Sequence, residues 1–159
     1  MKNIDLSRFS FGITAAITTS LAIIIGLGPT HNPKIYIIST LLVLAIADNL
    51  TDSLGIHIYR ESQCIGEKRD TLISTISNFL TRLTISITLI MFVFLLPMQY
   101  AIISSVVLGL SLLTVLSYLI AIKQKKNPYK VVIEHIGIVV IVIIISYFLG
   151  QIITNYFNI

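Results

Sequence analysis

Five long apolar runs limit the possible folds of this chain more than any other feature of its sequence. The runs cover approximately residues 9–27, 35–59, 71–96, 100–122 and 131–156 of the 159 residues. Each reaches the roughly 20 residues that a helix needs to cross the hydrocarbon core of a bilayer. The sequence therefore predicts an all-α, polytopic membrane protein with five transmembrane helices.

The composition favours one membrane domain over a tethered soluble one. Hydrophobic residues make up 55% of the chain and charged residues only 11%, which is unlike a typical soluble domain. The connections between the runs are too short for a further domain, so residues 1–159 are predicted to form a single transmembrane domain. The sequence contains no phosphate-binding glycine loop, nucleophile elbow or zinc-binding motif, and we expect a protein that is not an enzyme.

The Lys and Arg residues are distributed unevenly over the connections. Nine of the eleven lie before the first run, after the second, or between the fourth and the fifth. Five spans place these regions on one side of the membrane, and cytoplasmic loops carry the excess of basic residues. The pattern predicts a multi-pass protein of the cell membrane with a cytoplasmic N-terminus and an external C-terminus. It also explains the net charge of +4 without a nucleic-acid partner, so membrane lipid is the expected surrounding.

Two carboxylates lie inside the second apolar run, where a charge needs a physical reason. An ionisable side chain near the bilayer centre costs roughly 2.5–3.5 kcal/mol on insertion scales, and it usually faces a partner or a water-filled path. Asp48 and Asp52 are four residues apart, so they share one helical face, with Asn49 beside them. In the third run, Asn78 and Arg82 are predicted to lie at comparable depths. We expect this part of the molecule to be its working surface.

The sequence leaves alternatives open for these polar residues. An Asp48–Arg82 pair would either gate a pathway or merely neutralise itself and lock the two helices, and Asp52 would then lack a cation. Glu134 and His135, at the start of the fifth run, would either join Asp52 at the cytoplasmic mouth or extend toward water at the membrane interface.

Two stretches resemble the vacuolar iron transporter family, in particular its small prokaryotic, archaeal-type members. Residues 11–27 read Phe-Gly-Ile-Thr-Ala-Ala-Ile-Thr-Thr-Ser and end in Gly26-Leu27, which is similar to the Thr-rich signature of that family's first helix. Gly55 and the pair Ser62-Gln63 resemble the segment that ends its second helix. The resemblance implies five helices, transport of a divalent metal, and a homodimer.

The chain departs from the family pattern at positions that bear on chemistry. Ala15 and Ala16 stand where the family has Asp and Gly, Asp52 stands at the second-helix Met, and Ile56 stands at the Glu of Gly-Glu-Tyr. The cytoplasmic metal-binding insertion after the second helix is missing. A carboxylate in place of a thioether favours manganese, magnesium, calcium or protons relative to iron.

These observations lead to one functional hypothesis and one rival. The hypothesis is a transporter-like protein that exports divalent cations of the iron or manganese class from the cytoplasm, with exchange for protons as its coupling. It needs no tightly bound cofactor, because the metal is the substrate. The rival is a non-transporting membrane scaffold with a static polar network. The hypothesis assigns metal binding to Asp48, Asp52, Asn49, Asn78, Glu134 and His135, and gating or charge pairing to Arg82.

Overall fold

The computed structural model of this protein describes residues 7–64 and 68–157 and consists of helices joined by short turns. The helices within these ranges are α1 (Ser7–Gly26), α2 (Pro33–Ser62), α3 (Lys68–Leu95), α4 (Met98–Lys123) and α5 (Pro128–Phe157). Each of the five is long and apolar enough to span a membrane. The predicted all-helical architecture is therefore confirmed, and the observed helix ends lie within a few residues of the predicted ones.

Proline marks most of the helix boundaries. Pro33 and Pro128 begin α2 and α5, a position that suits proline because the first backbone N–H groups of a helix have no intrahelical acceptor. Pro97 separates α3 from α4, and Pro29 lies in the turn after Gly26, where α1 ends. Because proline lacks a backbone N–H, it stops the preceding helix and starts a new one at low cost.

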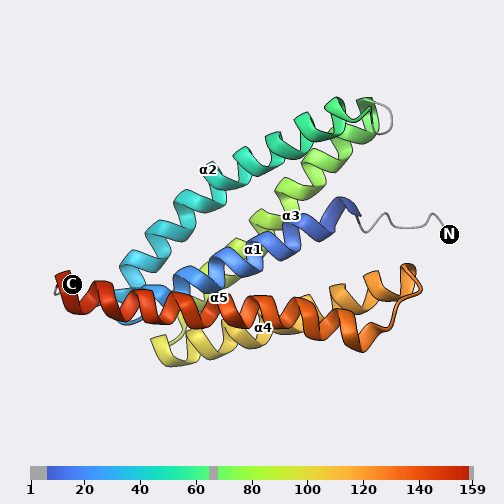
Figure 1. The fold of residues 1–159 in the computed structure, drawn as a ribbon. Coiled ribbons are helices and arrows are strands. Elements are labelled where there is room, and N and C mark those ends of the chain that lie inside the picture. The colour runs from blue at the N-terminus through green and yellow to red at the C-terminus, as the bar shows by residue number, and fades with distance from the viewer. Residues whose placement is uncertain (1–6, 65–67, 158–159) are drawn as a thin grey trace.

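The helices form two antiparallel pairs around a central helix (Figure 1). Helices α2 and α3 make one pair, and α4 and α5 make the other. Helix α1 contacts all four other helices. The two pairs converge at the end that holds the α1–α2 and α3–α4 turns, and they diverge toward the opposite end, where the N-terminus lies (Figure 1).

The apolar core lies mainly at the converging end. Its larger cluster joins α1, α2, α3 and α4, and the buried members are Ile24, Ile37, Leu41, Leu89, Ile90, Val93 and Ala101. A second cluster joins α1 to α4 and α5 through Ile17, Leu21, Leu113 and Val139. Helix α5 approaches α1 so closely at Gly150 that a Cβ atom there would collide with the backbone of Gly26.

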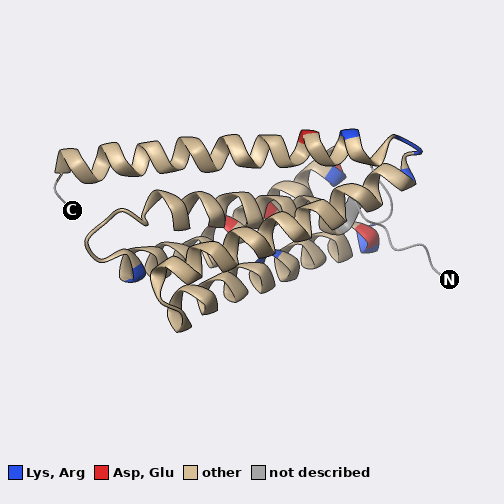
Figure 2. Ribbon diagram, turned by 90° about the horizontal axis from the view of Figure 1, so that it is seen from below, with Lys and Arg blue, Asp and Glu red and all other residues tan. Residues whose placement is uncertain are grey.

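Most of the charged residues lie at the ends of the helices, and a few lie near the middle of the bundle (Figure 2). In the described part of the chain, one end carries Arg60, Lys68, Arg69, Lys123, Lys125, Lys126 and Lys130, whereas Lys34 lies at the other end. Basic residues are therefore concentrated at one end of the helices, which is the asymmetry used to predict the orientation. The side of a membrane that this basic end faces stays a prediction.

Candidate functional site

Beyond the apolar core at the converging end, the interface between α2 and α3 contains a line of polar side chains. Asn49 and Ser53 of α2 and Asn78 of α3 are all buried. The Asn49 amide donates to the carbonyl oxygen of Phe79 at 2.9 Å, and the Asn78 amide donates to Ser53 Oγ at 3.2 Å. Such interhelical hydrogen bonds hold helices together in an environment where the hydrophobic effect between them is absent.

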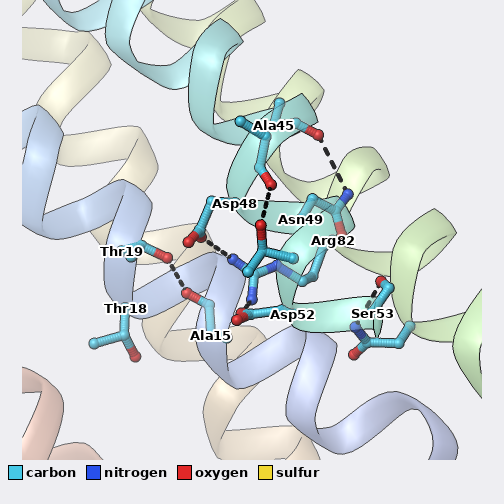
Figure 3. A network of polar contacts seen from close by, with 12 residues as sticks. Ala15, Thr18, Thr19, Ala45, Asp48, Asn49, Asp52, Ser53 and Arg82 are labelled. Carbon is cyan, nitrogen blue, oxygen red and sulfur yellow. Dashed lines mark hydrogen bonds and ion pairs between the residues drawn. The ribbon is translucent and has the colours of Figure 1, made fainter. Parts of the chain in front are cut away.

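Arg82 of α3 lies between the two carboxylates of α2 (Figure 3). Its Nη2 atom is 2.5 Å from Asp48 Oδ2, and its Nη1 atom donates to Asp52 Oδ2. The Arg82 side chain is only 4% exposed, whereas those of Asp48 and Asp52 are 34% and 30% exposed. The three charges form a triad, defined as Asp48, Asp52 and Arg82, with one negative charge in excess.

The triad confirms one sequence expectation and corrects another. The predicted pairing of Asp48 with Arg82 is present. The expectation that Asp52 lacks a cation is wrong, because the same guanidinium also binds Asp52. The planar fork of an arginine has five N–H donors, and two of its nitrogens reach carboxylates that stand one helical turn apart.

A cavity of about 330 Å³ opens beside the triad. Asp48, Asp52 and Arg82 form one side of it, and the other lining residues are Ala15, Thr18, Thr19 and Ala22 of α1 and Val142 of α5. The small side chains of α1 create this space, since larger ones would fill it. Val142 of α5 therefore closes a cavity whose other lining residues come from α1, α2 and α3.

The threonines add hydrogen-bond acceptors to the cavity. Thr18 donates its hydroxyl to the carbonyl oxygen of Thr14 at 2.8 Å, and Thr19 donates to that of Ala15 (Figure 3). Each hydroxyl oxygen keeps lone pairs after this donation. Together with the carboxylates, the cavity therefore offers oxygen acceptors, which is the chemistry that hard cations prefer.

Asn49 and Asn78 do not line this cavity, although both were expected to act with the aspartates. They are 1% and 0% exposed and lie within the α2–α3 interface. For Asn49 the reason is rotational, since each successive residue turns by about 100° around a helix, so that Asn49 points away from the direction of Asp48. Asn78 shares a helical face with Arg82 but lies one turn away from it, where its amide donates to Ser53. In the described residues, the Oδ1 atom of each asparagine has no hydrogen-bond partner.

Glu134 and His135 are also not brought to Asp52. His135 Nδ1 lies 2.8 Å from Ser117 Oγ of α4, and Glu134 is exposed. Neither residue lines the cavity beside the triad. The expected grouping at the mouth is corrected because the α4–α5 pair diverges from the α2–α3 pair toward this end (Figure 1).

One contribution was missed at the sequence level, and a second was expected as close helix packing without an identified partner. Ser53 fixes the Asn78 amide, and Gly12 of α1 packs directly onto Asn78 and Arg82. Ser53 follows Asn49 by four residues, so the helical spacing contains a signal for a shared polar face. Gly12 and Ala16 have the spacing of small residues that permits close helix approach. This spacing does not identify α3 as the partner, because the contact joins segments far apart in the chain.

Within residues 7–64 and 68–157, no group of three or more His, Cys, Asp or Glu side chains is arranged to hold a metal ion. A cation on Asp48 and Asp52 would therefore take its remaining ligands from hydroxyl oxygens, backbone carbonyls or water. Ca²⁺, Mg²⁺ and Mn²⁺ accept such oxygen ligands.

Comparisons with known proteins found no matching family model, no matching curated protein and no matching solved structure. The resemblance to the vacuolar iron transporter family stays a prediction from the quoted motifs.

Proposed function

We propose that this protein is a membrane transporter that moves a divalent metal cation of the iron or manganese class out of the cytoplasm, in exchange for protons. One observation carries the proposal: Asp48 and Asp52 open into a cavity near the middle of α2, a helix of 30 residues. A carboxylate at this depth is costly unless it has a function or a partner. The triad satisfies only part of this requirement, because one negative charge stays in excess.

Charge repulsion determines how such a transporter would work. Two unit charges 4 Å apart interact by about 4 kcal/mol at an effective dielectric constant of 20, and a divalent ion doubles this value. A divalent cation and the Arg82 guanidinium therefore exclude each other from the same carboxylates. In this proposal Arg82 acts as a tethered counter-ion that occupies the carboxylates when no substrate is bound, and it leaves them when the metal arrives.

The charge distribution and the resemblance support the direction and the class of substrate. In the proposal, the basic end of the helices is cytoplasmic under the positive-inside rule, and the protein is a multi-pass protein of the cell membrane. Ala15, at the position of the family's first-helix Asp, lines the same cavity as Asp52, at the position of its second-helix Met. In this proposal, the ligating side chain comes from α2 instead of α1, and it faces the same cavity. By resemblance, the transporter is a homodimer.

Flux measurements in liposomes test the proposal. The purified protein is reconstituted with a metal-sensitive dye, and uptake of Mn²⁺, Fe²⁺, Co²⁺, Zn²⁺ and Ca²⁺ is recorded with and without a pH gradient. We expect flux of at least one ion in the parent and none in Asp52→Asn. The matched control is Glu61→Gln, which removes a carboxylate that does not line the cavity and should leave flux unchanged.

One observation favours a second candidate function, the non-transporting scaffold. Arg82 is 4% exposed and binds both carboxylates, so the triad would also serve as a permanent link between α2 and α3. In that case no ion is transported by the parent, and Asp52→Asn affects only stability.

A further inference from the structure

Asn78 carries a buried acceptor that the described interactions do not use. Its side chain is 0% exposed, and its Oδ1 atom has no hydrogen-bond partner in the described residues. Buried polar atoms are nearly always hydrogen-bonded, so an exception calls for an explanation. The amide nitrogen of Asn78 fixes the orientation of the side chain, since Nδ2 donates to Ser53 Oγ at 3.2 Å.

The unused oxygen and the Arg82 side chain lie against the same point of α1. A Cβ atom built on Gly12 would lie 2.7 Å from Asn78 Oδ1 and 3.4 Å from Arg82 Cγ. Residues four apart share one helical face, and helix side chains lean toward the N-terminus, which directs Arg82 back toward Asn78. The missing side chain at Gly12 leaves room for this approach.

From this geometry we infer that Asn78 Oδ1 is the alternative hydrogen-bond acceptor of Arg82. The inference rests on the proposed function, in which a cation displaces the guanidinium from Asp48 and Asp52. On displacement, the guanidinium rotates about its side-chain bonds and donates to Asn78 Oδ1. Arg82 then keeps a hydrogen bond inside the protein while the two carboxylates hold the cation. Asn78 is thus a positioning residue, and it does not bind the metal.

Asn49 provides a matched control for this role. It is also an asparagine in the α2–α3 interface, it is 1% exposed, and its Oδ1 atom has no hydrogen-bond partner among the described residues. Its amide nitrogen, however, faces the carbonyl oxygens of Phe79 and Ala45 at 2.9 and 3.3 Å. A carboxylate at position 49 would therefore meet other oxygens.

A charge-relocation experiment without metal tests the inference. The double variant Asp48→Asn/Asp52→Asn leaves Arg82 without an anionic partner, and its Tm in detergent should fall. Adding Asn78→Asp provides a carboxylate at the alternative acceptor and should restore at least half of the lost Tm. Adding Asn49→Asp should restore nothing. Equal Tm values for the two triple variants would overturn the inference, because a merely structural asparagine predicts no specific rescue.

The single substitutions decide the matter if the double variant does not fold. In the parent background, Asn78→Asp should have a Tm about 5 °C above that of Asn49→Asp, because a carboxylate at position 49 would face the carbonyl oxygens of Ala45 and Phe79. The reverse order would overturn the inference. If Asn78→Asp restores the Tm but the parent transports no metal, the transport proposal fails and the role of Asn78 as an acceptor for Arg82 stands. If the parent transports a metal but Asn78→Asp restores no Tm, the role of Asn78 is overturned and the transport proposal stands.

Discussion

Arg82 Nη2 lies 2.5 Å from Asp48 Oδ2 although 34 residues separate the two in the chain. This contact joins α3 to α2 near the middle of both helices. The same guanidinium binds Asp52 one turn further along α2. Two carboxylates therefore share one cation, and the stability of the helix pair and the charge of the cavity depend on the same side chain.

The triad predicts unequal effects of removing its members. Arg82→Gln leaves two carboxylates without a cation and should cost roughly 3 kcal/mol of unfolding free energy. Asp48→Asn should cost about 1–2 kcal/mol, because Arg82 keeps Asp52. The loss of unfolding free energy in the double variant Arg82→Gln/Asp48→Asn should be smaller than the sum of the losses in the two single variants. Thermal unfolding in detergent measures all three, and strict additivity would contradict the shared contact.

Replacing either aspartate should lower the stability of the protein by a similar amount, and both aspartates should be required for metal flux. Each variant, Asp48→Asn or Asp52→Asn, retains one ion pair with Arg82, so both proteins should fold. The sequence predicted no cation for Asp52, and the expectation changes because Asp52 shares Arg82 with Asp48. Liposome flux should be lost in both, because a cation needs both carboxylates once Arg82 has left. Full flux in either variant would remove that residue from the site.

Gly12 should not tolerate a side chain. The Cβ atom of Gly12→Ala would lie 2.7 Å from Asn78 Oδ1 and 3.0 Å from the Asn78 carbonyl oxygen, so α1 must shift away from α3. We expect a loss of about 1–3 kcal/mol. The control is Gly55→Ala, since a Cβ atom there meets nothing within 4 Å and should stabilise α2 by about 0.5–1 kcal/mol. Equal Tm values for both variants would contradict the close approach of α1.

The contact between α5 and α1 gives a second test of the packing. Gly150→Ala places a Cβ atom against the Gly26 backbone, whereas the same change at Gly137 meets nothing within 4 Å. We expect Gly150→Ala to lower the Tm and Gly137→Ala to leave it unchanged or raised. Thermal unfolding of the two variants in one detergent compares them directly. A lower Tm for Gly137→Ala than for Gly150→Ala would mean that α5 lies elsewhere.

The predicted orientation can be tested through Cys64, a free and exposed thiol beyond the end of α2. If the basic end is cytoplasmic, an impermeant thiol reagent added to intact cells should not label Cys64. The matched control is His31→Cys in a Cys64→Ser background, because His31 is exposed in the turn at the opposite end. Labelling of Cys64 from outside, with no labelling at position 31, would reverse the topology.

The sequence alone determined the five helices and their approximate ends. The length of an apolar run decides whether a helix spans a bilayer, and proline decides locally where it starts and stops. Matching depths on neighbouring antiparallel helices also predicted that Asp48 would meet Arg82. These features depend on local chemistry and on distance along a helix, and both can be read from the order of the residues.

Only the tertiary structure decided which side chains face one another. The sharing of Arg82 by Asp52, the burial of Asn49 and Asn78 away from the cavity, and the pairing of His135 with Ser117 all depend on helix rotation and tilt. Rotation and tilt are determined by packing contacts between distant segments, such as the contact of Gly12 with α3 or of Gly150 with Gly26. No local pattern encodes such contacts, because each one requires two surfaces to fit at the same time.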